Sequence, residues 1–522
     1  MSLREFLRLK RENRKAYGLY LQHISSGNKF YTLTIQLAFF MSLLPFALRT
    51  PLIGNLLRAV QNLFVGYIVE NDSPLQESAS SETLYFVENF AYEKTRVYDY
   101  VIVGSGPGAA VAAAKISSEK SVLIIEQGDF PLTSTSKHHT LEHVRNDFSK
   151  KGQEFILSSW MAQFAQAATF GGGSEVNSGL YHQLPAHLLE TFSNESRLDM
   201  RTYLASELRI KEFLRVEEMS VDKNHSIIAR GANRSGMEYG NIPRWRHYAS
   251  DGSFVHHGMN FLFWSERISS GAIEFLRNTK VYGIDNSDQK VIRVKVKSDK
   301  KGAQTIRCNN LIMSAGTIQT PYVLCKSGIL PWRDTRFQWH PMVRTMVESD
   351  AQDLGLLDVD PFQCWTADRR FKIGSAVSTP GLMAMNLGRI MKPDELSALR
   401  SIYISFVSSG RGGLVPNTDI PWYAPSQLDK ENLKQSREIL ETFVTAAGAK
   451  FVNHTEKVKL GVSTVHIFGS MPLNSSIYET GTARLSKDHR IQISDASLLP
   501  FGPGVNPQGI VMSLCDAMIR GD

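Results

Sequence analysis

Two glycines and a glutamate early in the chain have the spacing of a site that binds an adenine dinucleotide. Gly104 and Gly106 follow the apolar run 100–103, and Glu126 ends a second apolar run, 122–125. Glycines at such a turn let the backbone lie against a pyrophosphate, to which the following helix presents unpaired N–H groups. A carboxylate about 20 residues further on can accept hydrogen bonds from ribose hydroxyls. This pattern predicts dinucleotide binding.

The elements that must position this turn surround it in the sequence. The runs 100–103 and 122–125 predict two strands, and an alanine-rich helix is expected between them. Ala109 stands where a third glycine is usual, and small side chains on this helix let it pack closely on the sheet. A glycine pattern alone also occurs in ordinary turns. The prediction therefore depends on the flanking strands and on the glutamate.

Length and composition indicate a large globular protein. The chain has 522 residues, 42% of them hydrophobic, which suits two or three domains or one elaborate pair. The formal net charge is only +7, and no nucleic-acid-binding module is recognisable. We therefore expect no nucleic-acid partner.

The N-terminus is basic and is followed by apolar segments. The run 33–48 is the most apolar part of the chain, but its 16 residues include Pro45 and fall short of the roughly 20 that span a bilayer. Segment 53–68 has apolar residues at helical spacing on one face. The basic residues of the first 29 positions are Arg4, Arg8, Lys10, Arg11, Arg14, Lys15 and Lys29, against Glu5 and Glu12. Peripheral membrane contact through residues 1–70 and packing on the enzyme both remain open.

The cysteines indicate neither a metal site nor a disulfide framework. Cys308, Cys325, Cys364 and Cys515 are far apart and show no C-x-x-C spacing. The basic leader is also too long for a secretion signal. We expect a cytoplasmic protein, peripheral on the membrane if the N-terminus binds lipid, and no metal ion.

The polar segment 71–82 reads as a linker, so the main body is expected to begin near residue 83. After Gly271 we expect a short helix over 272–277, strands over 281–284, 291–296 and 311–314, and a helix opened by Thr320 and Pro321. The predicted divisions are a helical extension over 1–82, a nucleotide-binding domain over 83–330 with substrate-domain segments around 185–265, a substrate domain over 331–460, and a return to the nucleotide fold over 461–522.

Four separated segments together resemble the glucose-methanol-choline (GMC) oxidoreductase family of FAD enzymes. They are the glycine turn with Glu126, the loop GGGSEVN at 171–177, the block SAGTIQTP at 314–321, and the C-terminal segments 462–471 and 491–521. The resemblance implies an α/β fold in which a discontinuous Rossmann-like FAD domain is joined by an inserted substrate domain with an antiparallel sheet.

The resemblance also implies which residues hold the cofactor. Gly104, Gly106 and Glu126 would bind the ADP half of FAD, with Ala109 in the helix behind them. Some relatives attach FAD through a histidine just before the asparagine of the glycine loop, where this chain has Val176, so we expect non-covalent FAD. The further cofactor residues implied are Gly172, Gly173, Ser174, Asn177, Val281, Asp495, Ala496 and Pro507.

Two C-terminal residues match the family's catalytic positions. His466 lies in HIFGS and Asn506 in GVNPQ, and in the family such residues face flavin N5. Oxidation of an alcohol removes the hydroxyl proton while the carbon-bound hydrogen leaves as hydride, so His466 is the expected base. Asn506 would orient the same oxygen. Ser470 replaces the family's usual threonine. His340, beside Pro341, also resembles a family position near the active-site wall, but a structural turn is the role we expect. His256 and His257 fit either a substrate cavity or a core.

Several functions remain open at this stage. The first is an FAD-dependent alcohol dehydrogenase or oxidase acting on a small molecule, a sugar or a lipophilic alcohol. The alternatives are a non-oxidative lyase on the same flavin scaffold, an interaction protein with or without flavin, and an NAD enzyme if the glycine turn is considered alone. The sequence identifies neither the substrate nor the electron acceptor.

Overall fold

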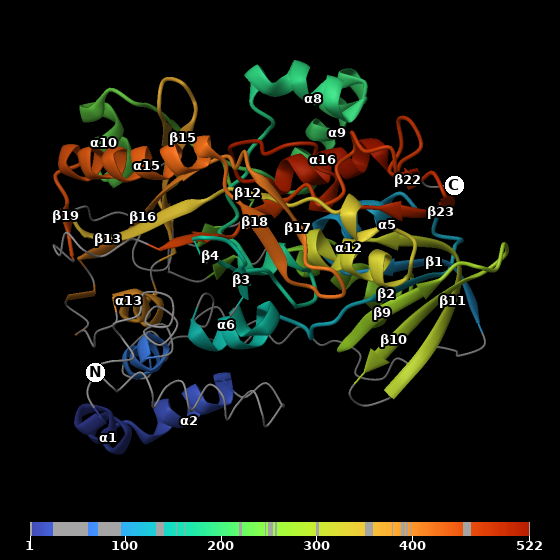
Figure 1. Cartoon of the computed structure of the whole chain (residues 1–522), viewed down its shortest axis with the longest axis horizontal. Helices are drawn as coiled ribbons and strands as arrows, with labels where there is room; N and C mark the ends of the chain where they lie inside the picture. The colour runs from blue at the N-terminus through green and yellow to red at the C-terminus, as the bar shows by residue number, and fades with distance from the viewer. Residues whose placement is uncertain are drawn as a thin grey trace.

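Two β-sheets lie side by side at the centre of the molecule, and the N-terminal helices lie below the second sheet in the view of Figure 1. The computed structural model describes residues 3–24, 61–70, 96–131, 140–152, 154–160, 162–218, 222–245, 247–248, 254–255, 258–298, 302–349, 359–377, 379–387, 392, 395–396, 398–452 and 461–520.

The first sheet is the predicted nucleotide-binding sheet, with the strand order β22-β23-β11-β1-β2-β8. Neighbouring strands from β23 to β8 run parallel, so the loops that follow them meet at one edge. β10 extends the sheet as an antiparallel partner of β11, and β9 pairs antiparallel with β10. The bounds are β1 Val97–Val103, β2 Val122–Ile125, β8 Glu274–Leu276, β9 Thr279–Asp285, β10 Ile292–Ser298, β11 Gly302–Met313, β22 Arg484–Leu485 and β23 Asp488–Ile493.

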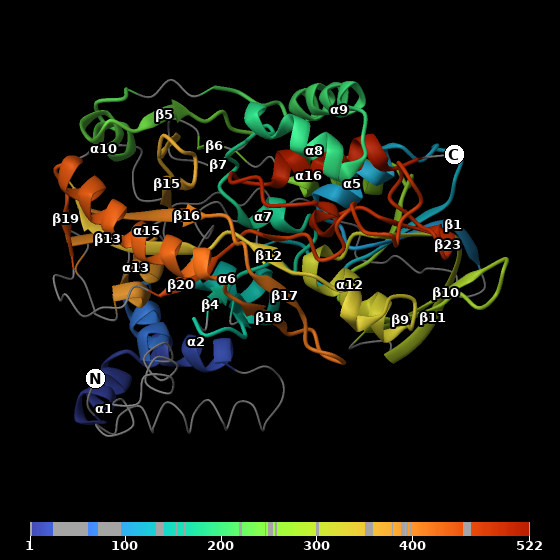
Figure 2. The same ribbon diagram turned by 45° about the horizontal axis from the view of Figure 1, so that its top comes forward.

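The βαβ unit predicted from the glycine turn is confirmed, because α5 (Pro107–Ala114) connects the parallel strands β1 and β2. Its alanines are buried, as close packing on a sheet requires. α16 (Gln508–Met518) lies between α5 and α9 (Met200–Phe213), and Figure 2 shows these three helices together. α16 is buried on nearly all sides.

Two local expectations in this region are wrong. Residues 272–277 do not form a helix, because 274–276 pair with β2 as the edge strand β8. α12 (Gly316–Lys326) begins four residues before Thr320. The Gly316 N–H donates to Asp495 Oδ2 at 2.9 Å, and a helix start held by so distant a residue has no local sequence signal.

The second sheet is mostly antiparallel and has the order β3-β4-β20-β13-β16-β15-β14-β5, with β19 paired to β13. Its strands come from separate parts of the chain. β3, β4 and β5 precede β11 of the first sheet in sequence, and the remaining strands, up to β20, follow it. The bounds are β3 Glu154–Ile156, β4 Ala162–Phe164, β5 Glu238–Asn241, β13 Met342–Glu348, β14 Phe362–Trp365, β15 Phe371–Ala376, β16 Leu399–Phe406, β19 Lys450–Phe451 and β20 Val462–Thr464.

One face of the second sheet packs under α10 (Ile227–Ser235) and α15 (Gln427–Ala446). Alternate strand residues such as Val343, Ile373 and Ile404 form that apolar core. α15 begins with a capping box between Ser426 and Asp429. The opposite face of β13, β15 and β16 carries Arg344, Lys372 and Tyr403 beside apolar residues such as Met346 and Leu399, which pack in a separate cluster.

The N-terminal helices pack on the body of the protein. α1 (Leu3–Glu12), α2 (Arg14–Ile24) and residues 61–70 share a core with α6 (Leu141–Asp147) through buried side chains that include Tyr20 and Phe64. The Glu70 carboxylate accepts the Leu141 N–H at 2.6 Å. The apolar run 33–48 lies outside the described residues, and among those described no helix is long and apolar enough to cross a bilayer.

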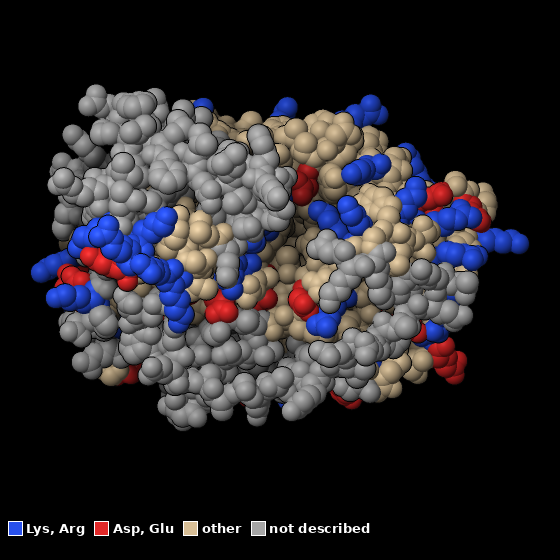
Figure 3. Space-filling view, turned by 90° about the horizontal axis from the view of Figure 1, so that it is seen from below, with Lys and Arg blue, Asp and Glu red and all other residues tan. Residues whose placement is uncertain are grey.

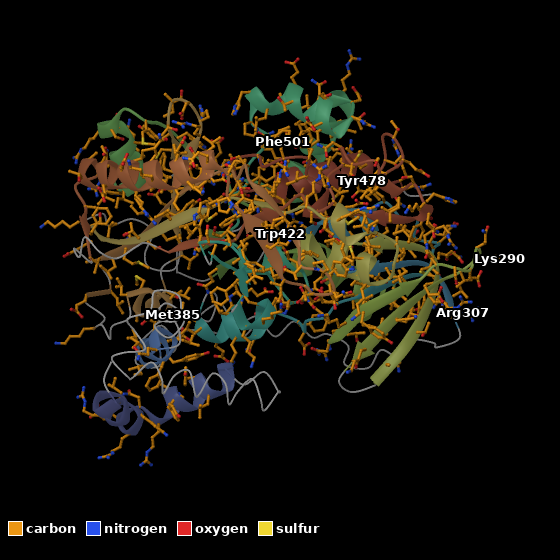
Figure 4. The ribbon with its side chains drawn as sticks, viewed as in Figure 1. Lys290, Arg307, Met385, Trp422, Tyr478 and Phe501 are labelled. Atoms are coloured by element: carbon orange, nitrogen blue, oxygen red, sulfur yellow. The ribbon has the colours of Figure 1, made fainter. Side chains whose placement is uncertain are left out.

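Shorter elements complete the described fold, and all four cysteines are buried and unpaired. These elements are η4 Ser149–Gly152, α7 Gly173–Val176, η5 Ala186–Leu188, α8 Leu189–Ser196, β6 His247–Tyr248, β7 Phe254–Val255, η6 Asn260–Trp264, α11 Ser265–Ser269, η7 Trp332–Asp334, β12 Gln338–Trp339, α13 Pro380–Leu387, β17 Arg411–Leu414, β18 Pro421–Ala424, β21 Ile467–Phe468 and η8 Ala496–Leu498. Trp422, labelled near the centre of Figure 4, belongs to β18.

Candidate active site

The loops that follow β1, β11 and β23 meet at the carboxyl edge of the first sheet. Gly104 has φ +95°, and a Cβ built there would lie 2.2 Å from the Ser314 carbonyl oxygen. Ser314 Oγ in turn donates to the Ser494 carbonyl at 2.6 Å. The glycine at 104 is therefore required by both its backbone conformation and the close approach of the β11 loop.

The close approach of helix and sheet occurs at Gly108, beside Ala109. A Cβ on Gly108 would lie 1.9 Å from the Ser494 carbonyl oxygen, and Ser494 Oγ donates to the Gly108 carbonyl at 2.8 Å. Ala109 is fully buried in the same helix. The sequence assigned the third small position to Ala109 because of its spacing, and the strand that contacts Gly108 lies almost 400 residues away in the chain.

The second glycine loop contacts the first. Gly172 has φ +60°, and a Cβ there would lie 2.6 Å from Gly106 Cα. A Cβ built on Gly173, the first residue of α7, would have no neighbouring atom within 4 Å. Two glycine turns in backbone contact, with open space beside Gly173, form a cradle lined by main-chain groups.

Glu126 is buried where β2 ends at this cradle. Its Oε2 accepts the Ser105 N–H at 3.1 Å and the Ser105 hydroxyl at 2.8 Å, while its Oε1 accepts the Gly128 N–H at 2.9 Å. Burial raises the pKa of this carboxyl, and these donors oppose that shift. Val281 lies on β9, two residues beyond Thr279, whose N–H donates to the Glu126 carbonyl at 2.9 Å. The structure thus brings Val281 to the Glu126 end of the cradle.

Asp495 lies at the other end of the cradle as the N-cap of η8. Its carboxylate accepts the Gly316 N–H and the Thr320 hydroxyl, the latter at 2.5 Å. Burial raises the pKa of Asp495. The neighbouring Ala496 accepts the Gly469 N–H at 3.0 Å, which connects this end to the loop that carries His466.

The glycine loop is also tied to the start of α16. Asn177 Nδ2 donates to Gln508 Oε1 at 2.6 Å, and Pro507 is the N-cap residue of that helix. Ser174 is fully buried, and its hydroxyl donates to the Gly171 carbonyl at 2.7 Å and accepts the Met259 N–H at 2.9 Å. Ser174 therefore shapes the loop, and Asn177 connects it to the segment that holds Asn506.

These residues fit the ADP and flavin portions of FAD. The glycine cradle leaves room for a pyrophosphate beside Gly173, and α5 begins at Pro107 with its N-terminus at the same turn. Glu126 offers a buried carboxylate about 20 residues after the glycine turn, the spacing typical of a ribose contact. The fit is one of main-chain donors and open backbone, as a dinucleotide requires.

His466 precedes β21, and its ring packs against His340. The two Nδ1 atoms are 3.3 Å apart, and the chain segments are held together because the His340 N–H donates to the His466 carbonyl at 3.1 Å. His340 was expected to occupy a structural turn, and its ring in fact touches the candidate base. His256 and His257 lie outside the described residues.

The proton positions on the two imidazoles depend on one backbone group. The Gly504 N–H donates to His340 Nε2 at 3.3 Å, so a neutral His340 carries its proton on Nδ1 and donates it to His466 Nδ1. His466 then holds its own proton on Nε2. The reverse arrangement, in which His466 donates from Nδ1 and has a free lone pair on Nε2, breaks the long Gly504 bond at a cost of about 1 kcal/mol.

Asn506 is fixed by a buried lysine. Lys372 Nζ, on β15, donates to Asn506 Oδ1 at 2.7 Å, and only 2% of Lys372 is exposed. A lysine only donates, so the amide oxygen of Asn506 faces Lys372 and its NH₂ group points elsewhere. The loop before Asn506 is anchored by Phe501, which packs edge-on against Phe192 of α8 at 5.9 Å and is labelled below that helix in Figure 4.

The electrostatics keep these groups neutral or weakly basic. Burial, followed by the charge of Lys372, lowers the pKa of His340 to about 3. Burial lowers the pKa of His466 well below its usual value, with further contributions from His340 and Lys372. Burial alone lowers the pKa of Lys372 to about 7. At neutral pH both imidazoles are therefore uncharged.

The sequence did not single out Lys372, Arg344 or His182 as site residues, and it favoured a structural turn at His340. Lys372 stands in FKIGSA, where a lysine on an alternating strand normally reads as solvent-exposed. Its neighbours Phe371 and Ile373 are buried, but this alternation is equally typical of a half-exposed strand, so the sequence holds no signal that Lys372 is buried.

Comparison with known proteins gives a consistent family match. The profile of the GMC oxidoreductase family matches residues 98–342. The chain is 22% identical over 475 residues to an uncharacterized GMC-type oxidoreductase, y4nJ, of Sinorhizobium fredii, which covers 80% of this chain and 92% of that protein.

Two further proteins extend the comparison. The chain is 22% identical over 488 residues to long-chain-alcohol oxidase FAO4A of Arabidopsis thaliana, covering 80% of this chain and 67% of that protein. Among solved structures, pyridoxine 4-oxidase from Mesorbium loti superposes with a TM-score of 0.60 at 14% identity, covering 80% of this chain and 98% of that one. The structural likeness shows a shared fold.

Proposed function

The chain belongs to the GMC oxidoreductase family of FAD-dependent enzymes that act on alcohols, and from that premise we propose that His466 is the base and Asn506 the orienting group for oxidation of a CH–OH group. The observation that carries this proposal is that the segments of His466 and Asn506 meet beside the glycine cradle. His340 contacts His466 and accepts the Gly504 N–H, and Asn177 donates to Gln508. FAD, when bound, supplies the acceptor at N5 for the hydride that leaves the substrate carbon.

His466 has the state that a base needs. Its lowered pKa keeps the ring neutral at pH 7. His340 Nδ1 can accept a hydrogen bond from the Nδ1–H of His466, which leaves the lone pair on His466 Nε2 to receive the hydroxyl proton. The required tautomer costs about one weak hydrogen bond from Gly504. His340 therefore acts as a positioning residue for His466.

Asn506 complements this base by donating to the substrate oxygen. Because Lys372 holds the amide oxygen, the Asn506 NH₂ group is available to the oxygen that becomes a carbonyl during oxidation. Asn506 also directly precedes the N-terminus of α16, where negative charge on that oxygen is favoured.

We infer that FAD is held without a covalent bond to the protein. Val176 stands where some relatives have the attaching histidine, and a valine side chain has no nucleophile. Acid precipitation of purified enzyme should therefore leave the yellow colour in the supernatant. Flavin retained in the pellet would contradict this assignment.

The substrate is a small-molecule or lipophilic alcohol, and the long-chain-alcohol oxidase relative supports a lipophilic one. We further propose a cytoplasmic enzyme that touches the membrane through its N-terminal helices. The support is the basic surface of α1: Lys and Arg side chains gather at the end of the molecule where that helix lies (Figure 3).

Anaerobic reduction of the bound flavin tests the reaction type. We expect at least one member of a panel of long-chain alcohols, sterols and sugars to bleach the flavin absorbance in the absence of oxygen. A lyase on the same scaffold turns over substrate without bleaching. Absence of bleaching across the whole panel would therefore argue for the lyase and against oxidation.

A further inference from the structure

The face of the second sheet opposite α10 and α15 is unusually cationic where it meets Asn506. Arg344 on β13 pairs with Tyr403 on β16, and Tyr403 pairs with Gly374 on β15. Lys372 is two residues from Gly374 and so projects from the same face. Since Lys372 donates to Asn506, this is the face that looks toward the proposed catalytic pair.

Lys372 has donors to spare. An ammonium group has three N–H donors, and Asn506 Oδ1 takes one of them. The next feature beside Nζ is the Tyr403 ring, whose centroid lies 5.6 Å away. A nearly fully buried ammonium with unused donors calls for an acceptor that the protein does not provide there.

Neighbouring groups show the same lack of acceptors. Arg344 Nε has no hydrogen bond within the described residues, and its Nη2 reaches only the Met342 sulfur at 3.8 Å. Gln363 is fully buried beside His182, and neither of its amide atoms forms a well-aligned hydrogen bond to a described residue. Lys372, Arg344 and Gln363 thus lie on the same face of neighbouring strands and have donors without protein partners among the described residues.

The cluster also lacks a counter-charge. Lys372 and Arg344 both contribute to lowering the pKa of His466, as nearby positive charges do. In the parts of the chain that the structure describes, neither Lys372 nor Arg344 forms an ion pair with a carboxylate. A buried ammonium and a half-buried guanidinium, with free donors and no paired carboxylate among the described residues, form a site that an anionic ligand completes.

We propose that the substrate carries a carboxylate next to its reacting hydroxyl, and that Lys372 and Arg344 bind this carboxylate. The proposal rests on the proposed alcohol oxidation at His466 and Asn506 and narrows its substrate class to hydroxy acids. A carboxylate has two oxygens and about four acceptor positions, which matches the spare donors of Lys372, Arg344 and Gln363.

The position of Lys372 limits the spacing of the two substrate groups. Nζ donates to one end of the Asn506 amide, and the other end of the same amide donates to the reacting hydroxyl. Ordinary hydrogen-bond lengths then place Nζ within about 8 Å of that hydroxyl oxygen. A carboxylate bound to Nζ therefore lies near the reacting carbon, and the shortest substrates that meet this limit are 2-hydroxy and 3-hydroxy acids.

The reaction balances with FAD as the oxidant. The C–H bond of the carbinol carbon breaks and its electron pair leaves with the hydrogen to FAD, while the hydroxyl proton passes to His466 and then to solvent. The product is the corresponding keto acid, with its carboxylate unchanged. Lys372 and Arg344 keep their protons throughout.

Binding is tested first with a probe that cannot be oxidised. Hexanoate and hexanamide share a hydrocarbon chain and differ in charge, and each is titrated into full-length holoenzyme while the flavin absorbance is followed. We expect hexanoate to perturb the spectrum saturably and hexanamide to bind at least about tenfold more weakly, the factor for one hydrogen bond to a charged group. Equal binding of the two probes, or no binding of hexanoate, would overturn the carboxylate site.

Turnover is tested with matched pairs of substrates. We expect anaerobic flavin reduction by 2-hydroxyhexanoate to exceed that by its methyl ester by about tenfold or more in rate constant over Kd, and to exceed that by 6-hydroxyhexanoate. Arg344→Gln should lower this value for the acid by roughly 10- to 100-fold and leave the ester within about threefold. Arg344→Lys should restore part of the loss.

A matched control is Arg370→Gln, which removes an exposed arginine that pairs with Asp368 just before β15, the strand of Lys372; it should change the rate constant over Kd for neither the acid nor the ester. If the ester and the acid react equally, the alcohol oxidation stands and the carboxylate site fails. If hexanoate binds through Arg344 but no hydroxy compound reduces the flavin, the anion site stands and the proposed oxidation fails.

Discussion

Replacement of Lys372 by methionine should stabilise the protein at low pH and lose that advantage as the pH rises. Burial lowers the pKa of Lys372 from 10.5 to about 7, so the folded protein resists its charging. The unfolded chain keeps an ordinary lysine and binds more protons than the folded chain between these two values. Wild-type stability contributed by this site therefore increases with pH across that window.

The size of the effect follows from the two pKa values. Charging Lys372 costs the folded state about 4 to 5 kcal/mol at pH 6 and about 2 kcal/mol at pH 9. Methionine has a similar length and no charge, so Lys372→Met removes this cost at both pH values. The difference in free energy of unfolding between variant and wild type should therefore shrink by about 2.5 kcal/mol from pH 6 to pH 9.

Urea denaturation with excess FAD at the two pH values measures this difference. The charged and titratable groups that face Lys372 are Arg344, Tyr403, His182, His340 and His466, and the imidazoles among them are held neutral by burial across this range. Lys434→Met on α15 is the control, because the side chain of Lys434 is 81% exposed. A variant-to-wild-type difference that is the same at pH 6 and pH 9 would refute the reasoning, since it would mean that Lys372 is fully charged in the folded protein.

Three further predictions concern the cofactor, the base and the N-terminus. Gly173→Ala should leave the stability of the FAD-free protein unchanged, because no protein atom lies near the added methyl, but should weaken FAD binding by at least about tenfold. Gly240→Ala, where a Cβ also has open space, is the control. Equal FAD affinities of Gly173→Ala and wild type would mean that the pyrophosphate does not lie beside Gly173. His340→Leu should slow flavin reduction by about tenfold or more without loss of FAD, since His466 loses its Nδ1 partner; an unchanged rate would make the histidine contact irrelevant. Replacing Arg8, Lys10 and Arg11 of α1 by glutamine should reduce sedimentation with anionic vesicles, and undiminished sedimentation would exclude α1 as the membrane contact. Charge removal suits this test better than deletion of residues 1–70, because Phe64 is fully buried against the body.

The nucleotide-binding part of the fold could be predicted because its signals are local. The glycine turn, the buried runs 100–103 and 122–125 and Glu126 all lie within 30 residues, and the structure has the expected β1, α5 and β2 around them. The edge strand β8 was mistaken for a helix because three residues carry almost no periodicity. These residues form a strand because they pair with β2.

The polar surroundings of the candidate site could not be predicted in the same way. Lys372 and Arg344 come from separate strands and His340 from the link between β12 and β13, so their proximity depends on the register of the second sheet. Lys372 is read from the sequence as an ordinary strand lysine, and only the fold shows that it is buried against Asn506. Long-range pairing of this kind leaves no spacing rule in the chain.

The most direct test of the account is the rate of anaerobic flavin reduction by the best alcohol substrate, compared between wild type and His466→Ala. Loss of a general base costs about 10²- to 10⁴-fold, and FAD should remain bound because His466 lies outside the glycine cradle. We predict a fall in the reduction rate constant by at least about 100-fold at unchanged flavin content. A reduction rate within a few fold of wild type would contradict the assignment of His466 as the base.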